Sequence, residues 1–338
     1  MHLRAVFVRA TCAARVYNPP RDLNFWSRLL EVIRGLHNLD PRYRGCALTI
    51  GNFDGVHLGH QAVIDQLRSR ANGLPTTLMT FEPHPFEYLS PERAPTRITG
   101  VIDKLDCLAK TGIDQVLVVR FSPSFASMEP DEFIRDVIID GLDARTIVVG
   151  DDFRFGRRGA GDFSLLLDFA ARSSIDVARR DSFEIDGQRV SSSAIRESLS
   201  SGDLETAERF LGRKYSIQGR VAYGRQLGRT IGFPTANVRL NRANPPISGV
   251  FAVKVYRHGH DDALPGVANV GRRPTVNGEG VQLEVNLFDF DQAIYGERID
   301  VEMVARIRPE QKFESLDALK AQIARDANTA RDILGVTS

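Results

Sequence analysis

The first half of the chain alternates short apolar runs with segments of helical period. The runs are CALTI (46–50), TTLMTF (76–81), QVLVVRF (115–121) and RTIVVG (145–150). They are apolar almost throughout, which is typical of strands covered on both faces. Helix-like patterns fill residues 60–71, 101–111, 162–172 and 193–200, and the first has the stripe Val63, Ile64, Leu67 and Ala71. This alternation predicts βαβ units around a parallel sheet, that is, an α/β domain.

The rhythm changes after about residue 214. Strand-like runs then follow closely, with glycine, proline or polar turns between them: YSIQGRV (215–221), ANVRL (236–240), GVFAVKVY (249–256), GVANV (266–270), VQLEVNLFDF (281–290) and RIDVEMVARI (298–307). Strands without intervening helices predict a barrel or a sandwich. A closing helix is predicted near 315–334, with the apolar stripe Leu316, Leu319, Ile323, Ala327 and Ala330.

These patterns predict two domains, at 32–205 and 206–338, behind an N-terminal extension at 1–31. Residues 1–21 contain four arginines and no acidic residue. That composition is weakly similar to an organellar transit peptide, but it has few serines and little amphipathic order. We interpret residues 1–31 as a disordered extension or as the product of a start site placed too far upstream.

Charge and cysteine content narrow the class of protein. The chain has 44 basic and 43 acidic residues, so it lacks the basic excess of a nucleic-acid-binding protein. Its three cysteines are widely spaced and form no C-x-x-C pair, which argues against a disulfide framework or a cysteine zinc site. No apolar run has the roughly 18–20 residues of a membrane span. We therefore expect a cytoplasmic protein with no nucleic-acid or membrane partner.

The segment TIGNFDGVHLGHQAVID (49–65) places two histidines in a glycine-rich turn between a strand and a helix. His57 and His60 are three residues apart, whereas the zinc-protease helix needs H-E-x-x-H. A zinc site would need further ligands from elsewhere. A glycine-rich strand-to-helix turn lets backbone N–H groups face an anion, and histidines there can donate to phosphoryl oxygens. A tight turn with surface histidines stays open as a third interpretation.

Four separated motifs carry a resemblance to a known family. GNFDGVHLGH resembles the H-x-G-H loop of nucleotidylyltransferases, and the longer phrase TIGNFDGVHLGHQ is similar to the bacterial bifunctional riboflavin kinase/FMN adenylyltransferases. TFEPHP (80–85), VVGDDFRFG (148–156) and VSSSAIR (190–196) follow in the expected order. The resemblance covers about 32–336. It implies a Rossmann-like nucleotidylyltransferase domain, then a small antiparallel β-barrel domain with a C-terminal helix.

The resemblance also implies roles at matching positions of the first domain. His57 and His60 would stabilise the ATP phosphates, with Arg196 as a further catalytic group that binds phosphate in two-pronged fashion. The residues that would shape the ATP phosphate site are Gly51, Asn52, Phe53, Asp54, Gly59, Ser192 and Ser193. The serines could equally cap a helix. Asp152 and Phe155 would lie near the flavin or adenosine, and His84 is equally well explained as a rigid loop residue.

A second glycine-rich segment, YGRQLGRTIGFPTANV (223–238), lies in the barrel half. Gly224, Gly228 and Gly232 recur every four residues, which is costly on a helix and favours a wrapped loop. Thr235 and Asn237 lie two apart, on one side of an extended segment, and their oxygens suit Mg²⁺. An ordinary glycine-rich barrel loop is the alternative.

GFPTAN (232–237) is also a signature of riboflavin kinases, and the resemblance places it at an ATP and Mg²⁺ site. Glu284 alternates with the apolar residues Leu283 and Val285, so it should point away from the core. Taken alone it could be a solvated strand glutamate. The resemblance makes it the general base for the ribityl 5′-hydroxyl of riboflavin. Arg273, Thr275 and Phe313 would border that flavin site.

The resulting hypothesis is one enzyme with two active sites. The barrel would phosphorylate riboflavin with ATP to give FMN, and the α/β domain would adenylylate FMN with ATP to give FAD and pyrophosphate. Mg²⁺ would assist, and apo-flavoproteins could receive the product. Two alternatives stay open: a nucleotidylyltransferase for another acceptor, and a flavin-binding protein that has lost one or both activities.

Overall fold

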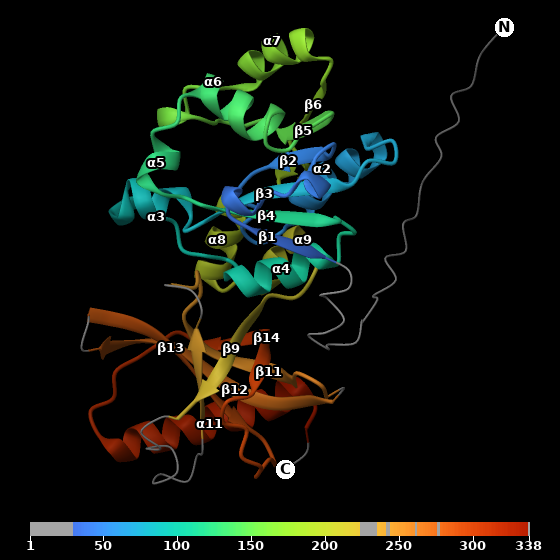
Figure 1. The fold of residues 1–338 in the computed structure, drawn as a ribbon. Helices are drawn as coiled ribbons and strands as arrows, with labels where there is room; N and C mark the ends of the chain where they lie inside the picture. The colour runs from blue at the N-terminus through green and yellow to red at the C-terminus, as the bar shows by residue number, and fades with distance from the viewer. Residues whose placement is uncertain (1–29, 224–234, 241–243, 261, 276–277, 337–338) are drawn as a thin grey trace, which may run out of the picture.

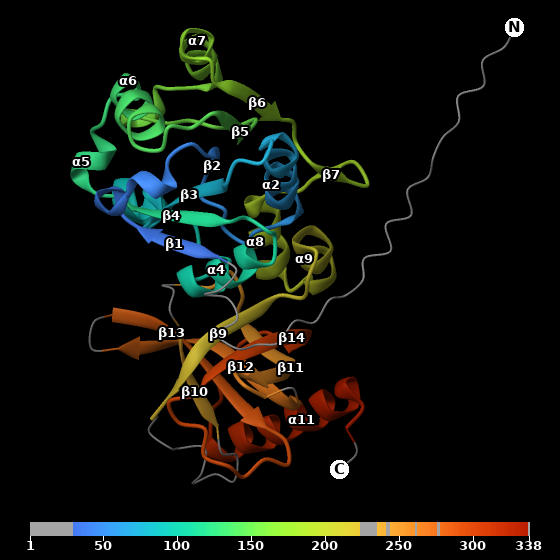
Figure 2. The same ribbon diagram turned by 45° about the vertical axis from the view of Figure 1, so that its right-hand side comes forward.

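The computed structural model describes residues 30–223, 235–240, 244–260, 262–275 and 278–336, with the backbone alone at 272–275 and 278–280. These residues form an α/β domain and a barrel domain, stacked one on the other (Figures 1 and 2). Residues 1–29 of the predicted extension lie outside the described ranges. The fold class predicted from the sequence is confirmed.

The α/β domain is built on a six-stranded sheet in which every pairing is parallel. Its strands are β1 (Glu31–Arg34), β2 (Ala47–Ile50), β3 (Thr76–Glu82), β4 (Gln115–Arg120), β5 (Thr146–Gly150) and β6 (Asp176–Arg180), in the order β1-β4-β3-β2-β5-β6. The sequence pattern missed β1 and β6. Both are edge strands of mixed polarity, EVIR and DVARR, and each pairs on one side only.

The sheet is covered on both faces, which explains its continuous apolar runs. Alternate residues of each central strand enter different cores: Leu78 packs with the helix residues Ile64 and Leu67, whereas Met79 packs on the other face with Ile134 and Val137. The stripe predicted at 60–71 is confirmed, since Val63, Ile64, Leu67 and Ala71 are all buried.

Helices fill the connections between the strands. They are α2 (Leu58–Arg70), α3 (Pro85–Leu89), α4 (Val101–Ala109), α5 (Pro123–Ala126), α6 (Pro130–Glu132), the π-helix η4 (Phe133–Ile139), α7 (Phe163–Ser173), α8 (Ser192–Ser201) and α9 (Leu204–Leu211). A small hairpin of β7 (Glu184–Ile185) and β8 (Gln188–Arg189) precedes α8. The predicted division between residues 205 and 206 falls within α9, and this division stays a prediction.

The second domain is a closed antiparallel barrel. Its strands are β9 (Ser216–Ala222), β10 (Ala236–Leu240), β11 (Gly249–Arg257), β12 (Ala263–Thr275), β13 (Gly278–Leu287) and β14 (Arg298–Arg308), in the order β10-β13-β12-β11-β14-β9. Closure pairs both edges of the sheet and leaves no open strand edge. Inward residues such as Val253, Leu283 and Val301 fill its core.

The closing helix α11 (Leu316–Leu334) lies along the barrel (Figure 1). Its predicted apolar stripe is only partly correct. Ala327 and Ala330 are buried, but Leu316 is 57% exposed. The buried face instead includes Asp326, whose carboxylate pairs with Arg308 of β14 at 2.7 Å. A periodicity argument based on apolar residues cannot find a contact made by an ion pair.

The two domains meet through an apolar cluster and through polar links, among which three join the barrel strands and their connections to the α/β domain. Ile98, Leu199 and Phe210 belong to the same cluster as barrel residues. The guanidinium of Arg298 donates to the carboxylate of Asp106 at 2.8 Å. The guanidinium of Arg306 donates to the carbonyl of Ser201 at 2.9 Å, and the backbone N–H of Arg97 donates to the carbonyl of Asn244 at 3.1 Å.

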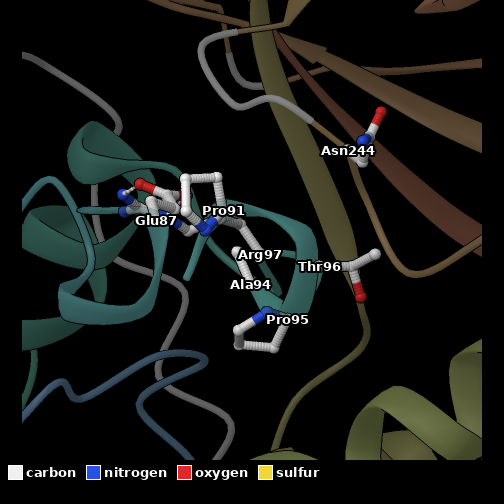
Figure 3. Close-up of a pocket in the computed structure, with 7 residues that line it drawn as sticks. All are labelled: Glu87, Pro91, Ala94, Pro95, Thr96, Arg97 and Asn244. Carbon is white, nitrogen blue, oxygen red and sulfur yellow. Dashed lines mark hydrogen bonds and ion pairs between the residues drawn. The ribbon is translucent and has the colours of Figure 1, made fainter. Parts of the chain in front are cut away.

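A cavity of about 300 Å³ lies at this junction between the domains. It is lined by Glu87, Pro91, Ala94–Arg97 and Asn244 (Figure 3).

Candidate active sites

The first site lies where the strand order of the sheet reverses. From β2 the chain winds outward through β3 and β4, and then returns to place β5 on the other side of β2. In open parallel sheets such a reversal leaves a crevice at the carboxyl ends of the strands. The glycine-rich segment 51–57 follows β2, and the DDFRFG segment follows β5. Two motifs predicted to act together therefore leave neighbouring strands at the same edge.

The segment 51–57, called here the phosphate loop, has an unusual backbone. Phe53 and Val56 have φ of 49° and 42°, and Gly55 has φ of 87°. Such values are strained for a β-branched residue and persist only where the surroundings fix them. Arg213, from the segment that joins the domains, donates to the carbonyls of Gly55 at 2.7 Å and Val56 at 3.3 Å. The loop is therefore held in its strained form by contacts from distant parts of the chain.

His57 is the N-cap of α2. Its Nδ1 accepts the backbone N–H of His60 at 3.2 Å, so the neutral ring carries its proton on Nε2 and can donate from there. The side chain is almost fully buried. Burial lowers the pKa of His57 to about 4, with Arg213 and Arg196 acting in the same direction and Asp54 opposing them. At neutral pH His57 is a fixed hydrogen-bond donor without charge.

His60 stacks on His57 with ring centroids 3.6 Å apart. Burial is the main cause that holds the pKa of His60 well below 6.5. Its Nδ1 is buried and has no hydrogen-bond partner among the described residues. A buried polar atom without a partner is costly and indicates that a bound group supplies one. This observation favours the ligand-binding interpretation of the loop over a tight turn with surface histidines.

Gly59 allows the close approach that this arrangement requires. A Cβ at Gly59 would lie 3.1 Å from the His57 ring and 3.2 Å from the carbonyl oxygen of Val190. At Gly51 a Cβ would lie 3.1 Å from the ring of Phe53. Any larger residue at Gly59 would therefore push against the His57 imidazole or against the segment that leads into α8.

Asp54 joins the phosphate loop to α8. Its buried carboxylate accepts hydrogen bonds from the backbone of Ile98 and Thr99 and a 2.7 Å ion-pair bond from Arg196. Although burial favours the neutral form, these N–H groups and the charge of Arg196 hold the pKa of Asp54 below its ordinary value. Ser192 donates to the carbonyl of Asp54 at 3.0 Å. The structure thus brings together the loop and the serine-arginine motif.

The three serines of the motif VSSSAIR have different structural positions. Ser191 is the N-cap of α8, and its hydroxyl accepts the N–H of Ala194 at 3.2 Å. Ser192 contacts the phosphate loop, and Ser193 is exposed. Arg196 also donates from Nε to the carbonyl of Thr96 at 2.7 Å, which leaves its other guanidinium nitrogen, Nη1, outside these bonds. Capping and contact with the loop therefore coexist in this motif.

His84 also has a structural role. It caps α3, with Nδ1 accepting the N–H of Phe86 at 3.2 Å, and Glu87 accepts the backbone N–H of His84 in return. Burial lowers the pKa of His84 to about 4. This agrees with the interpretation of His84 as a rigid loop residue.

The residues after β5 differ in exposure. Asp152 is exposed, whereas Phe155 is 7% exposed and packs among aromatic rings, 5.3 Å from Phe153 and 5.5 Å from Phe133. Phe155 is therefore part of the core on one face of the sheet. Their assignment to flavin binding stays a prediction.

The second site lies on the barrel, where three strands place polar side chains side by side. Glu284 of β13 is directly opposite Asn237 of β10 and directly opposite Asn269 of β12. Directly opposite residues in antiparallel strands project from the same face. Gln282 donates to the amide oxygen of Asn237. The flanking residues Leu283 and Val285 are fully buried, which confirms that Glu284 faces away from the core.

Sequence reasoning identified Asn237 and Glu284 but missed Asn269, because only the strand register brings it to them. Thr235 lies just before β10 and is partly buried. Gly224, Gly228 and Gly232 lie outside the described residues, as do the side chains of Arg273 and Thr275. Phe313, before α11, is partly buried, and the guanidinium of Arg308 lies 5.6 Å from its ring centre.

Two further observations bear on the alternatives. Within the described ranges no three His, Cys, Asp or Glu side chains come together as metal ligands, so a zinc site at His57 and His60 finds no third ligand there. Of the described helices, none combines the length and apolar character needed to cross a bilayer.

Comparison with known proteins agrees with this division into two sites. Residues 40–194 match the family model of FAD synthetase, and residues 211–334 match that of riboflavin kinase. Fold and sites together define a two-domain transferase, with a nucleotidyltransferase part followed by a kinase part.

The particular family follows from relatives along the whole chain. The chain is 48% identical over 304 residues to the bifunctional riboflavin kinase/FMN adenylyltransferase of Haemophilus influenzae, covering 89% of this chain and 98% of that protein. It is 48% identical over 311 residues to that of Escherichia coli K12, covering 91% and 99%. The chain belongs to the bifunctional riboflavin kinase/FMN adenylyltransferase family. The predicted family and enzyme class are confirmed.

A solved structure is similar to this one over most of the chain. It is the crystal structure of a macrolide-efflux protein from Streptococcus pneumoniae, with a TM-score of 0.73 and 30% identity, covering 90% of this chain and 99% of that one. Its likeness agrees with the order of domains described above.

Proposed function

We propose that this chain makes FMN at the barrel site and FAD at the site beneath the phosphate loop, with each reaction confined to one domain. Family membership supplies riboflavin, FMN and ATP as substrates. The observation that carries the adenylyl site is the partnerless buried Nδ1 of His60 beside the donor Nε2 of His57. We assign the two domains to 32–205 and 206–338.

In the adenylyl site the chain provides position and hydrogen bonds. His57 and His60 donate to the phosphate oxygens of ATP as negative charge develops on them, and burial makes such bonds stronger than in water. Arg196, held by Asp54, places its guanidinium at the same phosphates. Gly51, Asn52, Phe53, Gly59, Ser192 and Ser193 shape the cradle. The FMN phosphate attacks the α-phosphorus of ATP, and pyrophosphate leaves without a protein-bound intermediate.

In the kinase site Glu284 takes the proton from the ribityl 5′-hydroxyl of riboflavin as that oxygen attacks the γ-phosphate of ATP. Asn237 and Asn269, which flank Glu284 on the neighbouring strands, orient the reacting groups. Gly224, Gly228 and Gly232 form the ATP loop in this proposal. Arg273, Thr275 and Phe313 border the riboflavin ring, whereas Asp152 and Phe155 border the flavin in the other domain.

The oxygen donors at the barrel site fit Mg²⁺. The hydroxyl of Thr235 and the amide oxygen of Asn237 are hard ligands, and Glu284 adds a carboxylate on the same face as Asn237. Bound there, Mg²⁺ would neutralise phosphate charge and orient the γ-phosphate. In the adenylyl domain it would be held mainly by the substrate phosphates.

A product assay tests the proposal. Purified protein, riboflavin, ATP and Mg²⁺ are followed by chromatography over time. We expect FMN to rise first and then to be replaced by FAD. FMN alone would mean that the H-x-G-H domain is inactive or uses another acceptor. Bound flavin without turnover would support the alternative of a flavin-binding protein that has lost its activities.

We also propose where the enzyme acts and which proteins receive its product. The isolated cysteines and the need for ATP support a cytoplasmic enzyme. Apo-flavoproteins are the recipients of FAD in this scheme, and transfer is tested by adding an apo-flavoprotein to the product assay and measuring its cofactor content.

A further inference from the structure

A buried lysine with no role in the function proposed above contacts the backbone of the phosphate loop. Lys104, on α4, is 4% exposed. Its ammonium donates to the backbone carbonyl of Asn52 at 2.7 Å and to the hydroxyl of Thr80 at 3.3 Å. Thr80 donates to the same carbonyl at 3.1 Å. Lysines are seldom buried so fully, because an ammonium loses its hydration there.

Titratable groups from several neighbouring elements interact with Lys104. They are Asp54 of the phosphate loop, His60 of α2, Glu82 at the end of β3, His84 and Glu87 at the start of α3, and Arg97 before α4. Glu82 and Glu87 both bind Arg97, at 2.9 Å and below, and Asp54 binds Arg196. The described hydrogen bonds of Lys104 therefore go to a neutral carbonyl and a neutral hydroxyl.

We propose that Lys104 is a positioning residue for adenylyl transfer, which fixes the Asn52 carbonyl of the phosphate loop and places a positive charge behind the ATP phosphates. The inference rests on the function proposed above for this loop. His57 and His60 are uncharged at neutral pH, so they supply hydrogen bonds but no net charge to a polyphosphate. Lys104, bound to the Asn52 carbonyl, and Arg196, bound to the Asp54 carboxylate, supply that charge at two points of the loop.

The charge of Lys104 titrates within a measurable range. Burial lowers its pKa to about 8, with Arg97 acting in the same direction and Asp54, Glu82 and Glu87 opposing. The free enzyme therefore loses this charge as pH rises above about 8. Since kcat/KM reports the ionisation of the free enzyme, the loss appears as an alkaline limb in kcat/KM for ATP.

The experiment compares Lys104→Met, Lys104→Arg and wild type, with Lys110→Met as control. Lys110 is an exposed lysine at the end of the same helix. FAD formation from supplied FMN is measured from pH 6.5 to 9.5, and FMN formation by the same preparation reports on folding. We expect Lys104→Met to lower kcat/KM for ATP at least about tenfold at pH 7 and to remove the alkaline limb. Lys110→Met should match wild type.

Lys104→Arg provides the conservative comparison. Its guanidinium stays charged throughout this range, so it should exceed Lys104→Met at pH 7 and show no alkaline limb. Wild-type enzyme without an alkaline limb near pH 8, or Lys104→Met with the wild-type limb, would overturn the inference even if a variant folds poorly. Loss of FAD formation in His57→Ala alone would leave the proposed function standing and remove only the role of Lys104.

Discussion

Asp54 and Arg196 are 142 residues apart in the chain, and their side chains form a buried ion pair of 2.7 Å. Asp54 belongs to the phosphate loop after β2, and Arg196 comes from α8. The same carboxylate accepts the N–H groups of Ile98 and Thr99, so it joins three segments. A change in any one of these segments should therefore displace the others, and Arg196 depends on Asp54 for its position.

Asp54→Asn should separate the two activities. The amide keeps the shape of the side chain but cannot balance the charge of Arg196, and breaking a buried pair costs about 3 kcal/mol of unfolding free energy. We expect FAD formation from FMN to fall at least about tenfold. FMN formation from riboflavin, measured in the same preparation, should stay close to wild type. Equal losses in both reactions would contradict the confinement of Asp54 to one site.

The same variant should change the acid stability of the protein. The folded-state pKa of Asp54 is lowered, so its contribution to unfolding free energy is complete above the unfolded pKa of about 3.9 and is lost as pH falls through the folded pKa. Urea unfolding between pH 3 and 7 measures this. Wild type should lose stability more steeply than Asp54→Asn below about pH 4. Parallel curves would show that the pKa of Asp54 is the same in the folded and the unfolded protein.

His57 has two roles that one pair of variants distinguishes. Alanine removes both the imidazole and the cap of α2, whereas asparagine keeps a good N-cap acceptor. If Nε2 acts on the phosphates, both variants should lose FAD formation about 100- to 1000-fold while FMN formation continues. Only His57→Ala should also lose about 1 kcal/mol of unfolding free energy. Recovery of FAD formation in His57→Asn would reduce His57 to a cap.

Sequence patterns predicted those parts of the fold in which apolar residues recur at the spacing of a helix or a strand. The stripe Val63, Ile64 and Leu67 reports the buried face of α2 directly, because burial requires apolar residues at helical spacing. The alternation around Glu284 likewise indicated which face of β13 is polar. The motif residues His57, Asp54 and Arg196 were found by resemblance, and the structure places them together.

The features that were missed depend on contacts between distant segments. Asn269 reaches Glu284 only through the register of β12 and β13. Lysines are ordinarily exposed, yet Lys104 of α4 is buried, and its ammonium donates hydrogen bonds to the carbonyl of Asn52 and the hydroxyl of Thr80. The edge strands β1 and β6 are too polar for an apolar pattern. The only available signal for Lys104 was its position among the apolar residues of the helix 101–109.

The ion pair of Arg298 and Asp106 should stabilise the contact between the domains. Both side chains are largely buried, and burial raises the pKa of Asp106 against the lowering effect of Arg298. Arg298→Gln and Asp106→Asn should each cost about 1.5–3 kcal/mol, because each leaves a charged partner unmatched. The double variant should lose less than the sum of the two. Thermal unfolding of all four proteins measures the coupling, and strict additivity would show that the pair does not interact.

Glu284→Gln tests the general base of the kinase site. Glutamine keeps the size and a hydrogen-bonding amide between Asn237 and Asn269, but it cannot take a proton from the 5′-hydroxyl of riboflavin. We expect FMN formation to fall about 100- to 10,000-fold. FAD formation from supplied FMN should be unchanged, because that reaction uses the other domain. Both rates are measured by chromatography of the products.

The control for this variant is Glu302→Gln. Glu302 belongs to β14 of the same barrel, and its carboxylate lies 3.8 Å from the ammonium of Lys214, away from the register that joins Glu284 to the two asparagines. It should keep FMN formation within about threefold of wild type, since most substitutions of partly exposed polar residues change stability little. If Glu284→Gln kept FMN formation at the level of Glu302→Gln, the proton would have to leave by another acceptor. If Glu284→Gln also lost FAD formation from supplied FMN, the two sites could not be independent. The proposal that each reaction is confined to one domain would then be wrong.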